Sequence, residues 1–470
     1  MLVLSLTRKT LVRGLAPFSS ALSTVARVVA EDEISPLANP ASDGIHPLPG
    51  HSHAVKTSAG EEPVEITAVD VFGAAARLRG SLPRTAISHS RKLSAALGMD
   101  IYFKHEQTHA TGSFKERGAR NALLQLDSAA AKRGVAAASA GNHALALAHH
   151  GALLGVPVTV VMPTLAPLTK VQNCRELGAR VIVEGAHIGE SREAAFALAE
   201  REGLTYINGF DHPHIIAGAG TLGLEAIEQL PDLDAVVIPV GGAGLIAGVA
   251  LALKTLQPKV KIYGVEPENC PSLTLALAAG RPVTVPAFAT LADGLMVPRV
   301  GTNAFAIASR LVDGVVCVKE SYIALSMLRL LECEKVLIEG GGASGLAGLL
   351  AGLLPHLKGK RVLVPLCGGN VDTPVLGRVL ERGLAADGRL IKFEARVSDR
   401  PGGIAALTAV LAEAGVSVKE IFHERAWVAE DAYAVTIKIV VETPTAAGGD
   451  LMFAMLKAKG YSLQKQSPHQ

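Results

Sequence analysis

The sequence has few aromatic residues, which make up 4% of its 470 residues and include a single tryptophan. Its five cysteines form no CxxC pair, so we expect free thiols rather than a disulfide framework or a clustered zinc site. No apolar run reaches the roughly 18 residues that a membrane-spanning helix needs. The 45 basic and 43 acidic residues nearly cancel, which argues against a nucleic-acid or anionic-membrane partner and favours small molecules.

Small and aliphatic residues are abundant instead. Hydrophobic residues make up 49% of the chain, and glycine contributes 48 residues. This balance is typical of large α/β enzymes, in which helices pack closely on sheets. At about 100–200 residues per domain, the length predicts two or three domains.

The first 60 residues differ from the rest of the chain. Residues 1–30 contain Arg8, Lys9, Arg13 and Arg27 among serines, threonines and apolar residues, and no acid precedes Glu31. This composition is typical of a mitochondrial or plastid transit peptide, although a disordered tail would also fit it. Residues 31–60 are rich in proline, serine, histidine and glycine and are interpreted as a linker.

Strand-like and helix-like segments alternate between residues 61 and 385. The strand candidates are short, nearly continuous apolar runs, as expected of strands buried on both faces of a parallel sheet. They cover Val135–Ala138, Pro157–Met162, Ala179–Val183, Thr205–Asn208, Ala235–Val240, Val260–Glu266, Gly314–Val318 and Arg361–Leu366. Helical segments such as Leu145–Leu154 lie between them, so the pattern predicts an α/β catalytic domain of open, mostly parallel sheets. Ligands of such sheets bind at the carboxyl ends of the strands.

Residues 386–470 have a different pattern and follow a short linker. The order strand, helix, strand, strand, helix, strand predicts a ferredoxin-like α+β domain. Its segments are Ile391–Val397, Ile404–Ala414, Val416–His423, Ala432–Val441, Asp450–Lys459 and a short strand near Tyr461–Leu463. About 80 residues are enough for a small core of its own.

The stretch from Lys104 to Asn121 is centred on Lys115. An apolar strand leads into a polar loop, and Thr111-Gly112 is expected to cap a helix that has Lys115 in its first turn. The helix dipole disfavours a cation at this position. A covalent role, in which the lysine forms a Schiff base near a phosphate, would explain its presence. A lone lysine is more often a solvated surface residue.

Two loops follow strand candidates and open helices. Ser139-Ala140-Gly141-Asn142-His143 offers N–H groups and a helix dipole to a carboxylate, although an ordinary serine cap would also fit. Gly241-Gly242-Ala243-Gly244-Leu245 forms a nest of N–H groups for a phosphate, although a tight turn would also need glycines. Two more glycine-rich stretches cover residues 338–344 and 366–372, and Cys367 in the second could face a ligand ring or fill the core.

Together these motifs resemble the threonine/serine dehydratase (threonine ammonia-lyase) branch of the pyridoxal-phosphate enzymes with a tryptophan-synthase-β-like fold. The resemblance implies two open, mostly parallel sheets, pyridoxal 5′-phosphate as the cofactor, and β-elimination of L-threonine or L-serine to 2-oxobutanoate or pyruvate and ammonia. Five motifs in family order carry it: Thr111-Gly112-Ser113-Phe114-Lys115, Ser139-Ala140-Gly141-Asn142-His143, Val240-Gly241-Gly242-Ala243-Gly244-Leu245, Leu291-Ala292-Asp293-Gly294 and Cys367-Gly368-Gly369-Asn370.

The resemblance also implies a role for each motif. Lys115 would be the catalytic Schiff-base lysine, Phe114 would pack beside the cofactor ring, and Asn142 would bind the 3′-oxygen of the ring. Cys367 would face the pyridine nitrogen, where an uncharged thiol favours quick elimination. The phosphate would be held by the backbone N–H groups of Gly241, Gly242, Ala243, Gly244 and Leu245. The substrate carboxylate would be bound by Ser139, Ala140, Gly141, Asn142 and His143.

Two departures from the relatives bear on the alternatives. In serine racemases a serine stands at the position of Ala140, and alanine has no exchangeable proton, which disfavours racemisation. Glu266 matches a metal-binding position, but Ser272 stands where the relatives have aspartate, so we expect no tight metal site. A serine racemase or hydroxyaspartate dehydratase, or a non-catalytic amino-acid sensor, is kept as an alternative.

The C-terminal segment, with Asp399-Arg400-Pro401-Gly402 and His423-Glu424-Arg425, resembles an ACT-type amino-acid-sensing domain. In that family the loop near Gly402 and Gly403 lies at an effector site between two copies. The resemblance implies a homo-oligomer, a dimer or tetramer, with an effector such as isoleucine or valine and a setting such as isoleucine biosynthesis. A dimerisation module without a ligand fits the same pattern.

Overall fold

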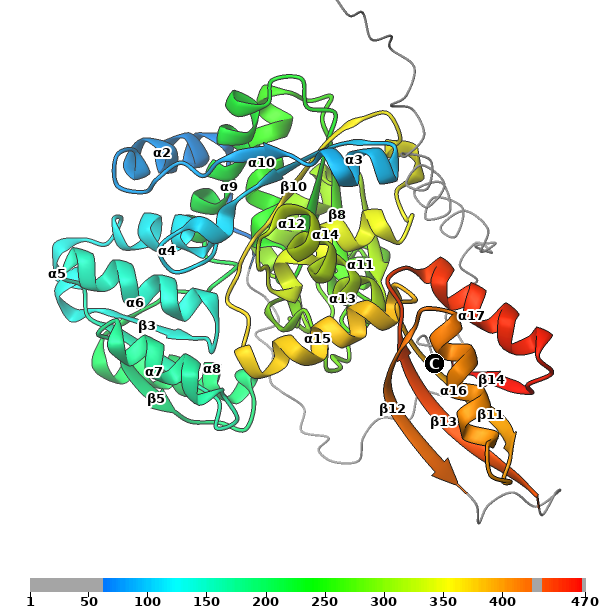
Figure 1. Ribbon diagram of the computed structural model, residues 1–470. Helices are drawn as coiled ribbons and strands as arrows, with labels where there is room; N and C mark the ends of the chain where they lie inside the picture. Colours follow the sequence, from blue (N-terminus) through cyan, green and yellow to red (C-terminus); the bar gives the residue numbers. More distant parts are fainter. Residues whose placement is uncertain (1–61, 425–432, 467–470) are drawn as a thin grey trace, which may run out of the picture.

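The computed structural model describes residues 62–424 and 433–466, so the predicted transit peptide and linker, residues 1–60, lie outside the described residues. Figure 1 shows a large sheet covered by helices, a second parallel sheet with its own helices, and a C-terminal antiparallel sheet near α15 (Thr373–Ala386). The prediction of an α/β fold with mostly parallel sheets is confirmed.

The large sheet has six strands in the order β1-β2-β10-β7-β8-β9. β1 pairs with β2 antiparallel, and every other neighbouring pair is parallel. The strands are β1 (Ile87–His89), β2 (Asp100–Lys104), β7 (Ala235–Pro239), β8 (Lys261–Pro267), β9 (Gly314–Val318) and β10 (Arg361–Pro365). Because β2, β10 and β7 are adjacent and parallel, the loops that follow them open at the same edge of the sheet.

Both faces of the large sheet are buried, as its continuous apolar strands predict. On β7, Val236 and Ile238 face one core, whereas Ala235 and Val237 face the other. The first core is completed by α2 (Ala68–Leu78), α9 (Pro213–Gln229), α10 (Gly244–Leu256), α11 (Ser272–Ala279) and α12 (Thr302–Leu311). The second contains α3 (Arg91–Leu97), α13 (Glu320–Arg329), α14 (Gly340–Leu350) and α15.

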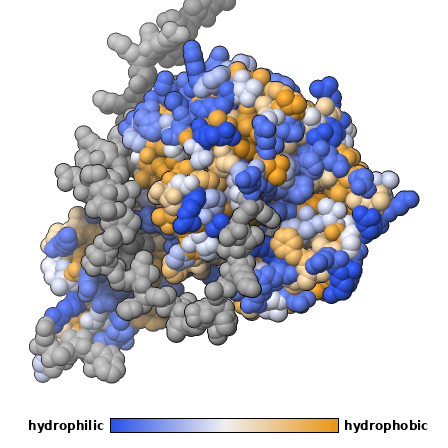
Figure 2. Space-filling model, turned by 180° about the vertical axis from the view of Figure 1, so that it is seen from behind, coloured by the Kyte–Doolittle hydropathy of each residue, from blue (hydrophilic) through white to orange (hydrophobic). Residues whose placement is uncertain are grey.

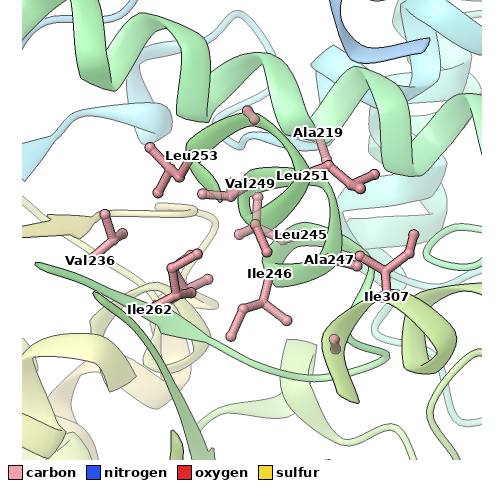
Figure 3. Packing of buried hydrophobic residues seen from close by; sticks show 14 of the residues in the cluster. Ala219, Val236, Leu245, Ile246, Ala247, Val249, Leu251, Leu253, Ile262 and Ile307 are labelled. Carbon is pink, nitrogen blue, oxygen red and sulfur yellow. The ribbon is translucent and has the colours of Figure 1, made fainter. Parts of the chain in front are cut away.

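Apolar contacts hold helix α10 on several sides. In Figure 3, Ile246 and Val249 of α10 lie among Val236 of β7, Ile262 of β8 and Ala219 of α9. Full burial of a side chain of this kind stabilises the fold by about 1.5–3 kcal/mol. The start of α10, which directly follows the glycine loop 241–243, is therefore fixed in place.

The small sheet has four parallel strands in the order β5-β4-β3-β6. On β4, Val160 and Met162 face a core formed with α6 and α7, whereas Val161 packs against Ala195 and Leu198 of α8. The strands are β3 (Val135–Ala138), β4 (Val158–Met162), β5 (Arg180–Val183) and β6 (Thr205–Tyr206). The helices are α4 (Lys115–Leu123), α5 (Ser128–Arg133), α6 (Asn142–Leu154), α7 (Leu168–Glu176) and α8 (Ile188–Glu202).

The C-terminal sheet is antiparallel, in the order β12-β13-β11-β14. Its buried face packs on two helices, with Phe393 and Ile437 against Leu407 and Met452. The elements are β11 (Leu390–Ser398), α16 (Gly403–Glu413), β12 (Ser417–Glu424), β13 (Ala434–Glu442), α17 (Ala446–Ala458) and β14 (Leu463–Lys465). This order is the predicted one, while the resemblance to an ACT-type domain stays a prediction.

Ion pairs join the C-terminal part to the helices of the large sheet. Arg389 pairs with Glu332 at 2.6 Å, and Lys419 of β12 pairs with Glu381 of α15 at 2.5 Å. Such partly exposed pairs stabilise by about 0–1 kcal/mol each, so the junction depends on several weak contacts.

Hydrophilic and hydrophobic residues are intermixed on the face of the molecule in Figure 2. Among the described helices, none combines the length and the hydropathy needed to cross a bilayer. All five cysteines are free thiols, as the sequence predicts.

One local prediction is wrong, because helix α4 does not begin under a Thr111 cap. The helix begins at Lys115, and Thr111 Oγ1 is buried with no partner in the described part of the chain. The segment before α4 instead runs along the loop after β10. Phe114 N donates to Cys367 O at 3.0 Å, and Gly369 N donates to Gly112 O at 2.9 Å. These bonds hold residues 112–114 away from the helix axis.

Candidate active site

Lys115 stands at the first position of α4 with its amine in a site between the two sheets. Its Nζ donates to the carbonyl of Gly209 at 2.5 Å and lies 5.2 Å from the ring centre of Phe114. Loss of hydration lowers the pKa of Lys115 to about 8, against the attraction of nearby Glu339. An amine with such a pKa is a usable nucleophile and base near neutral pH.

The glycine loop between β7 and α10 offers an anion site. Helix α10 has no side-chain cap, and none of the N–H groups of residues 242–246 has an acceptor among the described residues. Ala243 holds this turn with a left-handed φ of 69°. A methyl group at Gly242 would overlap the ring of Phe210, so the close approach of Phe210 requires glycine there. Uncapped N–H groups at a helix start favour a phosphate.

The loop between β3 and α6 is a second helix start without a side-chain cap. The N–H groups of Ala140, Asn142 and His143 have no acceptor within residues 62–424 and 433–466, and Ser139 Oγ accepts from Gly141 N at 3.3 Å. The side chain of His143 is buried, and its Nε2 lies 3.1 Å from the carbonyl oxygen of Ile207. Loss of hydration lowers the pKa of His143 to about 3, so the imidazole is neutral. The ring also packs on Gly209, whose carbonyl accepts from Lys115.

Cys367 follows β10 and is buried beside the segment that leads to Lys115. Its thiol donates to the carbonyl of Pro365 at 3.5 Å. Loss of hydration raises the pKa of Cys367 well above its usual value, and the carboxylates of Glu106 and Glu339 add to the effect. The thiol is therefore uncharged at neutral pH.

Two features of the site were not predicted from the sequence. Glu339, just before α14, accepts a hydrogen bond from Asn142 Nδ2 at 2.6 Å. Lys170 of α7 pairs with Asp293 at 3.0 Å and lies 3.6 Å from Asp372, and both acids belong to loops of the large sheet. Glu339 does lie in a glycine-rich stretch visible in the sequence, but no local pattern indicates its partner.

A buried ionic cluster joins Arg117 of α4 to residues of neighbouring segments. Arg117 donates to Glu106 at 2.7 and 2.8 Å and to Glu225 at 2.7 and 2.9 Å, and Lys104 donates to Glu225 at 2.8 Å. Arg117 holds the pKa of Glu106 well below its usual range, although burial alone would raise it. Since Arg117 lies two residues after Lys115, the cluster fixes the first turn of α4.

Glu266, which matches a metal-binding position of the relatives, already accepts hydrogen bonds from protein groups. Its carboxylate accepts from Leu273 N at 2.6 Å, from Thr274 N at 2.9 Å and from the hydroxyl of Thr274 at 2.7 Å. The helix start of α11 and a hydroxyl therefore supply its hydrogen bonds.

The family model for pyridoxal-phosphate dependent enzymes matches residues 78–368. The chain belongs to this family. It is 42% identical over 399 residues to the L-threonine ammonia-lyase of Thermotoga maritima, covering 85% of this chain and 99% of the relative. It is 44% identical over 349 residues to that of Geobacter sulfurreducens, covering 74% and 87%. The processed form of threonine deaminase isoform 2 from Solanum lycopersicum matches with a TM-score of 0.64 and 36% identity over 68% of this chain and 95% of that one.

These comparisons correct one prediction and confirm another. The cofactor of this pyridoxal-phosphate enzyme is pyridoxal 5′-phosphate, as the resemblance implied. The prediction of a mitochondrial or plastid location is wrong, because the two curated relatives come from bacteria, which have neither organelle.

Proposed function

We propose that the chain is a threonine ammonia-lyase that converts L-threonine to 2-oxobutanoate and ammonia, and L-serine to pyruvate and ammonia. The observation that carries the proposal is that residues 209–210 contact three groups. The carbonyl of Gly209 accepts from the Lys115 amine, Phe210 packs on Gly242 at the uncapped start of α10, and Gly209 packs on His143 at the uncapped start of α6. The three groups supply a nucleophilic amine, a phosphate site and a carboxylate site, and the relatives named above have this activity in their names.

The residues present fit pyridoxal 5′-phosphate. The free N–H groups of residues 242–246 would hold its phosphate, Asn142 its ring oxygen and Cys367 its pyridine nitrogen, with Phe114 beside the ring. The hydroxyl of Ser113 is buried with no partner among the described residues, so this pocket still has a polar group to satisfy. When bound, the cofactor supplies an aldehyde for amines and an electron-withdrawing ring that stabilises negative charge at the substrate α-carbon.

The chain's own residues would then act on the amino acid. The N–H groups at the start of α6 would orient the substrate carboxylate and thereby hold the α-carbon near Lys115. The neutral Lys115 Nζ would take the α-proton, the bond from the β-carbon to oxygen would break, and the leaving hydroxide would take a proton from the Lys115 ammonium and depart as water. Water then replaces nitrogen at the α-carbon, so that a 2-oxo acid and ammonia are released. The neutral thiol of Cys367 would offer the ring nitrogen no charged partner.

Elimination is favoured over racemisation because the residue beside the substrate site is Ala140. Racemisation needs a second acid on the opposite side of the α-carbon, and a methyl group has no proton to give. His143 is neutral and its Nε2 meets the carbonyl of Ile207, so it is a poor substitute for such an acid.

For the C-terminal sheet we propose a regulatory role as an ACT-type amino-acid-sensing unit, paired with a second copy in a dimer or tetramer. The supporting observation is the strand–helix order from β11 to β14 with one face packed on α16 and α17. Light scattering with and without isoleucine or valine, combined with assays of the same samples, tests both parts. A monomer whose activity ignores these amino acids would contradict the proposal.

The activity is tested by supplying the purified protein with pyridoxal 5′-phosphate and L-threonine, L-serine or L-threo-3-hydroxyaspartate. Release of 2-oxobutanoate and ammonia from L-threonine is expected, and Lys115→Ala is expected to abolish it. Formation of D-serine without pyruvate would instead support a racemase. Binding of amino acids without any turnover would support a non-catalytic sensor.

A further inference from the structure

Glu339 does not cap its own helix, although it stands at the residue before α14. Its side chain instead reaches Asn142 at the start of α6, with 2.6 Å between Oε1 and Nδ2. This bond connects a helix of the large sheet to a helix of the small sheet. It lies in the site of Lys115, since the carboxylate of Glu339 acts on the Lys115 amine.

Asn142 is held from its other end as well. Its Oδ1 accepts from Asn370 Nδ2 at 2.8 Å, and Asn370 Nδ2 also donates to the carbonyl of Thr111 at 2.8 Å. Glu339 can only accept from Asn142 when ionised, and the donor of Asn370 can only meet an oxygen. The two neighbours therefore determine which end of the Asn142 amide is nitrogen. The second proton of Nδ2 has no acceptor in the described part of the chain.

Two glycines leave room for the hydrogen-bonded side chains of Glu339, Asn142 and Asn370. A methyl group at Gly368 would overlap Glu339 Oε1, and one at Gly112 would lie 2.6 Å from Asn370 Oδ1. Both glycines belong to the motifs around Lys115 and Cys367. The arrangement is thus built into the loops that form the site.

Several titratable groups lie near Glu339. Asp293 faces it from the turn η2 (Asp293–Leu295), Lys170 from α7 and Lys115 from α4, and the Cys367 thiol lies in the neighbouring loop. Loss of hydration and then Asp293 raise the pKa of Glu339 to about 7, against the hydrogen bond from Asn142 and the attraction of Lys170. The Glu339 carboxyl can accept a hydrogen bond whether it is ionised or protonated, because the protonated form keeps its carbonyl oxygen.

We propose that Glu339 is a positioning residue for the cofactor. Glu339 accepts one Nδ2 proton of Asn142 and thereby directs the other Nδ2 proton at the ring oxygen of the cofactor. This inference rests on the proposed function only in taking Asn142 as the residue that meets the ring. Without Glu339 only Asn370 holds the Asn142 amide, so the Nδ2 proton is no longer fixed toward the ring oxygen and its hydrogen bond weakens.

The test is the affinity of the ligand-free protein for pyridoxal 5′-phosphate, measured by titration of protein fluorescence. Glu339→Leu is expected to weaken binding about tenfold, the value of one lost hydrogen bond. Glu339→Gln keeps an acceptor oxygen and is expected to stay within about threefold of the unmodified protein. The exposed Glu200→Gln serves as the control and is expected to bind unchanged.

The pair with Asn142 distinguishes positioning from a general structural role. If Glu339 acts through Asn142, the double variant Asn142→Ala with Glu339→Leu binds no more weakly than Asn142→Ala alone. Losses that multiply to about a hundredfold would overturn the proposal, and so would unchanged binding by Glu339→Leu. If Glu339→Leu does not fold, Glu339→Asp is used in its place, because its shorter side chain withdraws the acceptor by one methylene. Cofactor binding is again expected to weaken about tenfold. The measurement of cofactor binding requires no turnover. A protein without lyase activity would therefore contradict the proposed function but would leave the test of Glu339 valid.

Discussion

Lys170 and Asp293 form an ion pair near Glu339 of the site, with 3.0 Å between Nζ and Oδ2. Lys170 belongs to α7 of the small sheet, whereas Asp293 lies in a turn that packs on the large sheet. Lys170 is only 17% exposed, and a second acid, Asp372, lies 3.6 Å away. The pair therefore links the two halves of the molecule close to Glu339 of the site.

Removing that link is expected to raise KM more than it lowers kcat. For Lys170→Ala we expect KM for L-threonine to rise about fivefold, since a partly buried pair contributes on the order of 1 kcal/mol. Steady-state kinetics with the exposed Lys132→Ala as the matched control measures the effect. Equal kinetics in the two variants would exclude a role of the pair in substrate capture.

The capture of pyridoxal 5′-phosphate by the ligand-free protein is expected to depend on pH. Loss of hydration lowers the pKa of Lys115 to about 8, and only the neutral amine attacks an aldehyde. The rate should rise with pH up to about 8 and then level off. Stopped-flow absorbance measures this rate, and a rise that continues to pH 10 would contradict the low pKa.

Removing the negative charge of Glu339 should shift that profile in a defined direction. The carboxylate stabilises the protonated form of Lys115, so Glu339→Gln lowers the pKa of Lys115 further. The rise in capture rate should then occur at lower pH than in the unmodified protein. The same stopped-flow series decides this, and a shift toward higher pH would be inconsistent with the geometry.

Arg117 should matter for stability far more than a surface arginine. Arg117→Leu leaves Glu106 buried without its cation, which costs about 3–5 kcal/mol. The matched control is Arg201→Leu, which removes an exposed pair with Glu202 and should change the free energy of unfolding by less than about 1 kcal/mol. Denaturant unfolding measures both, and equal losses would contradict the role of the buried cluster.

The glycine loop should tolerate no side chain at Gly242. Gly242→Ala places a methyl group on the ring of Phe210, which moves the N–H groups of the loop and should weaken cofactor binding about tenfold or more. Gly377→Ala is a suitable control, because a methyl group at that helical position meets nothing within 4 Å. Fluorescence titration of both variants checks the expectation, and unchanged binding by Gly242→Ala would rule out this loop as the phosphate site.

Sequence patterns predicted the parallel core well because its strands are buried on both faces and read as continuous apolar runs. Val135–Ala138 and Gly314–Val318 have the predicted bounds. Local reasoning failed at Thr111, where hydrogen bonds to the loop after β10, more than 250 residues later, hold the chain out of the helix. Tertiary contacts of this kind have no local signature.

The predicted site residues come together, but their supporting residues could not be foreseen. Lys115, Asn142 and the glycine loop each stand at a strand end, where the parallel topology makes them neighbours. Glu339 and Lys170 act through partners 197 and 123 residues away, so their spacing carries no periodic signal. The inward turn of His143 likewise depends on Ile207, which belongs to a different segment.

The most direct test of the account is to identify the lysine that carries the cofactor. The protein is loaded with pyridoxal 5′-phosphate, reduced with borohydride to make the link permanent, digested and analysed by mass spectrometry. We expect the cofactor mass on the peptide that contains Lys115 and on no other. A label on a different lysine, or a protein that takes up no label, would contradict the assignment of this site.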